Sequence, residues 1–164
     1  MRIWHIAVLS WLPVVAAADT SSISIDHAWS RAAMSGHQGA VYMSITDTGS
    51  ADTLTSVSSP VATSADVHET INDNGVMKMR PVASLAIAPG KAVTLAPGGY
   101  HIMLMNLKHA LNEGDSFPIT LTFAKSGPVT TMVQVEKAGA TMPGMSMPGM
   151  SMPMHSNGGQ PSHP

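Results

Sequence analysis

The stretch "PITLTFAK", residues 118–125, decides the fold class. Ile119, Leu121 and Phe123 alternate with two threonines, so an extended chain would turn the three apolar side chains to one face and the threonines to the other. This period of two is typical of a strand that covers a core on one side only. The stretch therefore predicts a half-buried β-strand.

Short segments of similar length recur along most of the chain, and no long stretch has a helical period. Gly, Pro, Asn and Asp, the residues that turns require, separate them. So many short strands between turns predict an antiparallel β-sandwich or Greek-key barrel, but not the strand order. The further predicted strands are 22–29, 40–47, 52–59, 64–71, 76–82, 92–97, 100–105 and 129–136.

The first residues have the features of a secretory signal. Arg2 precedes an apolar run from residue 6 to residue 18, which ends in three alanines before Asp19. The run is shorter than the roughly 20 apolar residues that span a bilayer. We expect residues 1–18 to be a cleaved signal peptide, which predicts a periplasmic protein without stable membrane insertion. An uncleaved anchor is the alternative.

The composition excludes several classes of function. The chain has no cysteine, which rules out a disulfide scaffold, a thiol nucleophile and a blue-copper centre, whose copper needs a thiolate. With a net charge of −2 and 11% charged residues, nothing indicates a nucleic-acid partner. The chain does hold fourteen methionines and eight histidines, so the placement of these soft side chains is the informative feature.

One such group lies on the predicted strand in "GGYHIMLMN", residues 98–106. The period of two places His101, Met103 and Met105 on one face and apolar side chains on the other. Side chains two positions apart are about 7 Å from each other, which lets two long ones converge on one ion. The strand therefore offers an imidazole and thioethers together.

A second group lies in "DVHETINDNGVMKMRPV", residues 66–82, where Asn74-Gly75 predicts a hairpin turn. A four-residue loop would place His68 opposite Met79, and a two-residue loop would offset them by two positions on the same face. A three-residue loop would separate them. Met77, like Met105, is interpreted as a core residue.

Each group contributes one histidine and one methionine. Thioethers are poor ligands for zinc, calcium and magnesium, whereas the soft ion Cu(I) accepts them well. His68, Met79, His101 and Met103 are thus candidate copper ligands. A histidine and a methionine on a strand are also common as plain core or surface residues, so this interpretation stays open on spacing alone.

The spacing of these four residues resembles the signature of the periplasmic copper chaperones of the PCuAC family: His, ten residues, Met, twenty-one residues, His, one residue, Met. The segments "AWSRAA", "GAVYMSI", "MRPV", "LAPGGYHIMLMNLKHALNEGD" and "ITLTF" are also similar to that family, over residues 23–136. The resemblance implies a cupredoxin-like β-sandwich that holds Cu(I) on the four side chains. It also implies delivery to a copper-receiving oxidase subunit, as in cytochrome c oxidase assembly, or to another copper-assembly protein.

The sequence changes character after Glu136. Residues 137–164 repeat "MPGMS" and are rich in Pro and Gly, which predicts a flexible tail outside the domain formed by residues 19–136. The tail is a candidate second copper site for Cu(I) or Cu(II), and the alternative is a low-complexity segment without a metal. Its candidate ligands are Met142, Met145, Met147, Met150, Met152, Met154 and His155.

Three other functions compete with the chaperone. Copper storage or resistance would use the same ligands, with the tail as a buffer. An enzyme is not expected, because no acid/base pair or catalytic triad is present in the sequence pattern. A metal-free exported β-sandwich that binds proteins or surfaces would leave the four side chains without a ligand.

Overall fold

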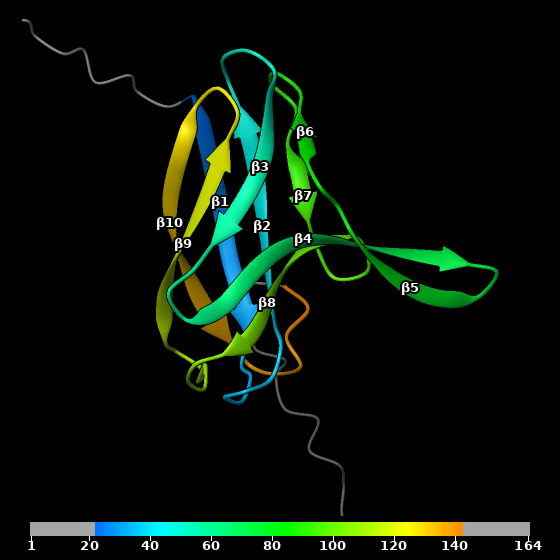
Figure 1. The fold of residues 1–164 in the computed structure, drawn as a ribbon, viewed down its shortest axis with the longest axis vertical. Helices are drawn as coiled ribbons and strands as arrows, with labels where there is room; N and C mark the ends of the chain where they lie inside the picture. Colours follow the sequence, from blue (N-terminus) through cyan, green and yellow to red (C-terminus); the bar gives the residue numbers. More distant parts are fainter. Residues whose placement is uncertain (1–21, 143–164) are drawn as a thin grey trace, which may run out of the picture.

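The computed structural model describes residues 22–142, and within them every regular element is a β-strand (Figure 1). The predicted signal peptide and the tail from residue 143 onward lie outside the described residues. No helix in the described part is long and apolar enough to cross a membrane. The strands are β1 (Ile23–Arg31), β2 (Gly39–Asp47), β3 (Asp52–Ser58), β4 (Ala62–Asp73), β5 (Val76–Pro81), β6 (Leu85–Ile87), β7 (Val93–Leu95), β8 (Tyr100–Leu107), β9 (Ser116–Phe123) and β10 (Gly127–Glu136).

The strands form one sheet that closes on itself. Its hydrogen-bonded order is β5-β4-β8-β2-β1-β10-β9-β3-β6, with β7 on β2. The path closes because β3 also pairs with β4, through Val57 and Ala65. The predicted all-β, sandwich-like fold is thereby confirmed.

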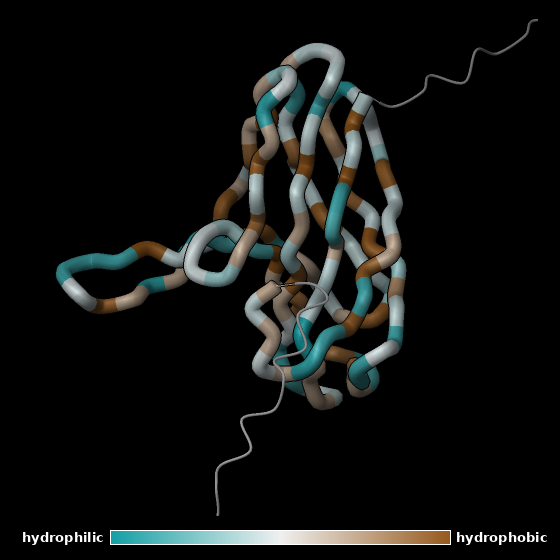
Figure 2. Tube along the Cα trace, turned by 180° about the vertical axis from the view of Figure 1, so that it is seen from behind, coloured by the Kyte–Doolittle hydropathy of each residue, from teal (hydrophilic) through white to brown (hydrophobic). Residues whose placement is uncertain are grey.

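Alternation along the strands builds the core inside this closed sheet. Ile119, Leu121 and Phe123 of β9 are buried as predicted, while Thr120 on the other face shares a hydrogen bond of 2.8 Å with Thr130 of β10. Brown hydrophobic positions recur between paler ones along the strands of the body in Figure 2. The apolar face of each strand thus supplies one wall of the core.

The structure differs from the fold predicted from the sequence in two ways. Strand β1 runs parallel to β10, with Trp29 paired to Gln134. Strand β6, with three residues, was not predicted, and its pairing with β3 is what makes it a strand. The first difference concerns pairing between strands far apart in the sequence, on which a local pattern carries no information.

The hairpin of β4 and β5 projects from the body, and we call it the arm (Figure 1). Strand β5 pairs only with β4, and all six of its residues are exposed. The inner part of β4 is held differently, because it also pairs with β8 from Ala62 to Glu69. The arm is therefore an extension of a body strand, with its root in the sheet and its end in solvent.

Asp52 ties the start of β3 to the turn between β9 and β10. Its carboxylate accepts N–H groups from Thr53 (2.7 Å), Lys125 (2.9 Å) and Ser126 (2.8 Å). Burial alone would raise the pKa of Asp52, but the backbone donors of Ser126, Thr53 and Lys125 outweigh it and lower the pKa from 3.8 to about 2. The ionised side chain therefore stabilises the fold.

We expect Asp52→Asn to lower the free energy of unfolding by about 1–2 kcal/mol at pH 7, because an amide directs N–H atoms at a backbone donor. A lowered pKa stabilises the folded state above the unfolded pKa of about 4, and this contribution is lost as the pH falls toward 2. The difference in the free energy of unfolding between variant and parent, measured by urea titration, should therefore disappear as the pH falls from about 4 to 2. Exposed Asp66, changed to Asn, is the control, and a gap independent of pH would contradict the assignment.

Candidate metal site

Strand β8 supplies a buried half of the site. Ile102 and Leu104 point into the core, so the alternation turns His101 and Met103 to the opposite face, as predicted. His101 is 4% exposed and Met103 9% exposed, yet neither belongs to the hydrophobic core cluster. The two side chains are shielded from water without being part of the core.

The ring of His101 is oriented by the backbone. Its Nδ1 atom lies 3.1 Å from the carbonyl oxygen of Gly99, which can only accept a hydrogen bond. Nδ1 therefore carries the proton, and the Nε2 lone pair remains available for a metal ion. This arrangement, in which one ring nitrogen is fixed by a carbonyl and the other ligates, is usual for metal-binding histidines.

The ring of Tyr42 lies beside His101 and is itself held by its neighbours. The Tyr42 ring centroid is 6.4 Å from that of His101, and Trp29 packs on Tyr42 at 4.7 Å. The Arg31 guanidinium lies over the Tyr42 ring, 5.6 Å from its centroid, and its Nε donates to the carbonyl oxygen of Ala140 at 2.8 Å. The imidazole thus rests against a rigid wall on β1 and β2.

His68 lies directly opposite His101 in the antiparallel pairing of β4 with β8. The two ring centroids are 6.1 Å apart, and His68 is half-buried. Residues opposite each other in such a ladder share one face of the sheet. The two predicted histidines are therefore neighbours, although they lie 33 positions apart in the sequence.

The arm brings Met79 to the same face. Asp73 pairs with Val76, so the loop contains only Asn74 and Gly75, which have φ values of 52° and 86°. Two left-handed residues are the requirement of a tight two-residue hairpin turn. Of the alternatives that the sequence allowed, the two-residue loop is therefore the one present.

This register pairs Met79 with Thr70 and His68 with Pro81. Met79 is thus offset from His68 by two positions and lies on the same face of the hairpin. Its side chain is 60% exposed, in contrast to the two buried candidate ligands on β8, His101 and Met103. The candidate site consequently has one exposed thioether beside three more sheltered side chains.

A groove of about 530 Å³ lies between the arm and the body. Met79, His101 and Met103 all line it, while His68 lies beside His101 and does not form its wall. Met77 lines the groove too and is 58% exposed, so its interpretation as a core residue was wrong. The spacing of two between Met77 and Met79 was the signal that should have placed both on one face.

The donor set suits a soft ion. Among the described residues there is no group of three or more His, Asp or Glu side chains that could hold a metal. The four candidate ligands are neutral, and the charged pairs of the arm, Arg80–Glu69 and Lys78–Asp73, involve side chains of the other face or the tip. Imidazole nitrogen and thioether sulfur together favour Cu(I) over hard divalent cations.

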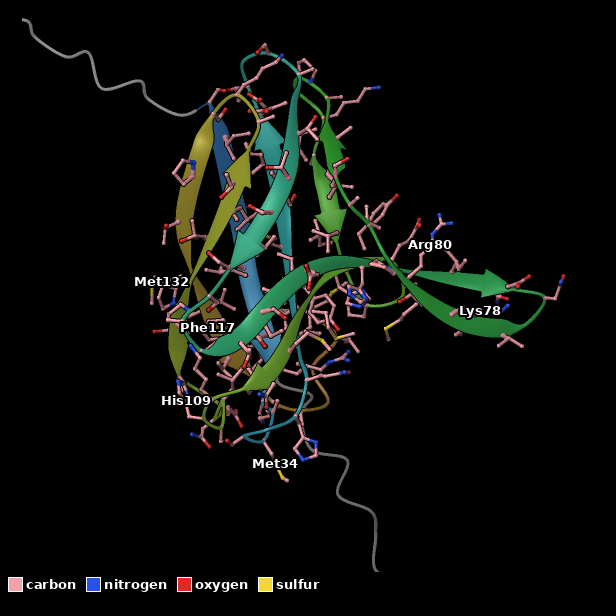
Figure 3. The ribbon with its side chains drawn as sticks, viewed as in Figure 1. Met34, Lys78, Arg80, His109, Phe117 and Met132 are labelled. Atoms are coloured by element: carbon pink, nitrogen blue, oxygen red, sulfur yellow. The ribbon has the colours of Figure 1, made fainter. Side chains whose placement is uncertain are left out.

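Other soft side chains lie elsewhere. His109 is exposed, on the side of the body away from the arm (Figure 3). Met142 lies beside a different cavity, lined also by His27 and Trp29. The remaining tail candidates, Met145 to His155, lie outside the described residues, so the tail site stays a prediction.

The segment after β10 is held against the body. Ala140 is buried against Trp29 and Tyr42, and its N–H donates to the carbonyl of Lys137 at 3.0 Å. Residues 137–142 belong to the predicted tail. This first part of the tail is therefore packed against the body, close to the groove. Ala138 is itself a groove residue.

The fold and this site define a class: a small closed β-sheet domain with a candidate histidine and methionine site for a metal at its rim. A family model described as putative lipoprotein LpqE-like matches residues 23–135, and the chain belongs to that family. A putative lipoprotein of Leifsonia xyli subsp. xyli is 35% identical over 116 residues, which are 70% of this chain and 69% of the relative.

Comparison with solved structures also identifies copper-binding domains as similar to this chain. The copper-bound PCuAC domain from PmoF2 is 29% identical, with a TM-score of 0.60 over 71% of this chain and 93% of that one. The CuI-DR1885 solution structure from Deinococcus radiodurans is 26% identical, with a TM-score of 0.51 over 73% and 83%. The resemblance to the PCuAC family is thereby confirmed.

We expect Gly75→Ala to weaken metal binding by about three- to tenfold, because a side chain at φ 86° is strained and the arm is a two-stranded ribbon with little stability of its own. A Cβ at this position meets no atom within 4 Å, so strain is its sole effect. Gly114→Ala is the matched control, at φ 88° in equally open space away from the arm. Competition titrations with Ag(I) or Cu(I) compare them, and equal losses would show that the hairpin turn does not set the site.

Proposed function

We propose that this protein is a periplasmic copper chaperone that carries Cu(I) on His68, Met79, His101 and Met103. The register of β4 with β8 carries the proposal, because it sets His68 opposite His101. The two-residue turn of the arm adds Met79 on the same face, and alternation along β8 adds Met103. In this proposal four soft donors from three strands converge on one ion, with His68 beside the groove that the other three line.

The absence of charge on the four proposed ligands supports Cu(I) as the bound ion. Neutral imidazoles and thioethers leave the bound ion with its own charge of +1, which is less costly to shelter near the buried half of the site than a charge of +2. The exported location without a single cysteine excludes the thiolates that many other copper sites use. Methionine and histidine are the soft ligands that remain.

Comparison with solved structures supports the choice of metal. One neighbour is described as a copper-bound PCuAC domain and another as the CuI form of DR1885. We extend this ion to the present chain because its own donor set favours Cu(I) independently of the comparison. Copper is the cargo of such a domain, and no catalytic role is assigned to it.

The unequal exposure of the ligands suggests how copper leaves. His101 and Met103 are buried, whereas Met79 is 60% exposed on strand β5, which pairs only with β4. An incoming ligand can replace Met79 first while the two buried side chains still hold the ion. A receiving site with thiolates binds Cu(I) more strongly, and each 1.4 kcal/mol of difference favours transfer by about tenfold.

The receiver that we propose is the copper centre of a respiratory oxidase, as in cytochrome c oxidase assembly. Periplasmic copper storage or resistance is the second candidate. It is favoured by one observation, the attachment of the segment 137–142 beside the groove, which places the start of the methionine-rich tail near the domain site. The two functions differ in stoichiometry and in transfer.

We expect His101→Ala and Met103→Leu each to reduce Cu(I) affinity by more than about tenfold. Loss of an outer partner of a metal ligand already costs about 10- to 100-fold, and these residues are proposed to touch the metal. Competition against a colorimetric Cu(I) chelator measures the change in the full chain.

Two matched controls test the specificity of that result. His109→Ala removes an exposed histidine, and Met132→Leu removes a methionine that is 50% exposed; Figure 3 shows both away from the arm. Both should bind Cu(I) like the parent. Unchanged affinity in His101→Ala would instead show that copper binds elsewhere in the chain and that the proposed four-residue site is wrong.

We expect the full chain and a variant that lacks residues 143–164 to deliver Cu(I) equally well to the soluble copper domain of an oxidase. The truncation keeps Ala140 and its contacts, so the domain is not disturbed. Metal analysis should find about one tightly held ion per domain in the truncated chain. Several ions that disappear with the tail, and no transfer from either form, would support storage.

A further inference from the structure

Met77 shares with Met79 its face of the arm, its exposure and its place in the groove wall, but it is not part of the four-residue signature. It pairs with Asn72 while Met79 pairs with Thr70, so the two methionines are two positions apart on one face of the arm. Both line the groove that His101 and Met103 line. Their exposures, 58% and 60%, are nearly the same.

The opposite face of β5 is different in chemistry. Arg80 donates to Glu69 through Nε at 3.0 Å and through Nη2 at 2.7 Å, and Lys78 extends to Asp73 at the tip of the arm. Figure 3 labels Lys78 and Arg80 along the arm. One face of β5 thus carries cations, and the face toward the groove carries two thioethers.

We propose that Met77 is a second thioether ligand of the arm, which exchanges with Met79 on the same Cu(I). This inference rests on the proposed function. Residues two apart on a strand are about 7 Å from each other, and two flexible methionine side chains can span that distance to one ion. In the exchange one copper–sulfur bond forms as another breaks, and copper remains Cu(I).

Exchange from Met79 to Met77 moves the ion outward along the arm. Met77 lies one step closer to the turn at Asn74-Gly75, where β4 no longer has β8 beside it. An acceptor that approaches the arm would meet copper on a sulfur farther from the buried half of the site. Met77 therefore lowers the barrier to release without adding a fifth ligand.

An isosteric substitution separates sulfur from bulk, because leucine keeps the volume and apolar character of methionine but cannot ligate. Met77→Leu, Met79→Leu and the double variant form a double-mutant cycle in the full chain. Met77→Leu should lower Cu(I) affinity by about twofold, the loss of one of two exchanging donors, and should slow transfer to a chelating acceptor several-fold. Met79→Leu should lose less than about tenfold, because Met77 takes its place.

The double variant, with both Met77→Leu and Met79→Leu, is the decisive member of the cycle. It should lose at least about tenfold more affinity than the two single losses combined, since no thioether remains on the arm. X-ray absorption should count two sulfur ligands on Cu(I) in Met79→Leu and one in the double variant. A double variant that equals Met79→Leu in affinity and in sulfur count would overturn the role of Met77.

His101→Ala, measured in parallel, separates this inference from the proposed function. If it loses copper while the cycle shows no effect of Met77, the four-residue site stands and only the exchange is wrong. If it binds copper like the parent, the site itself is wrong. Met132→Leu controls for the loss of an exposed methionine that does not face the groove.

Discussion

The candidate metal site depends on one constraint, the register of β4 against β8. A slip of one residue would turn His68 to the other side of the sheet from His101, because side chains alternate between faces. The register is fixed by the core on the other face, where Val67 of β4 pairs with Ile102 and Ala65 with Leu104. Apolar burial therefore positions the two imidazoles, although neither belongs to the core.

The two halves of the site are held by different forces. His101 is fixed by its hydrogen bond to Gly99 and by the Tyr42 ring, both parts of the body. Met79 is placed by a turn geometry and by pairing with a single neighbouring strand. A rigid half provides a defined place for the ion, and a half with fewer contacts can adjust to cargo or partner.

The sequence predicted the strands that are long enough to alternate and the faces on which their side chains lie. Ile119, Leu121 and Phe123 illustrate this, since a single strand contains all the information that their burial requires. It did not predict the strand order, the parallel pairing of β1 with β10 or the short β6, which depend on contacts between distant segments. For the site, alternation supplied the His101 and Met103 pair, but the loop length that places Met79 depends on the φ values of two turn residues.

Strand β5 is an edge strand, and its chemistry has a consequence for the behaviour of the protein in concentrated solution. An exposed edge with apolar side chains invites pairing with the edge of another molecule, which leads to aggregation. The thioethers that face the groove cannot be replaced by charges if they bind metal. Lys78 and Arg80, alternating with them, place charged side chains on this strand, which is one of the means by which natural proteins protect an exposed edge from pairing. The arm can therefore expose its soft side chains and still remain unpaired.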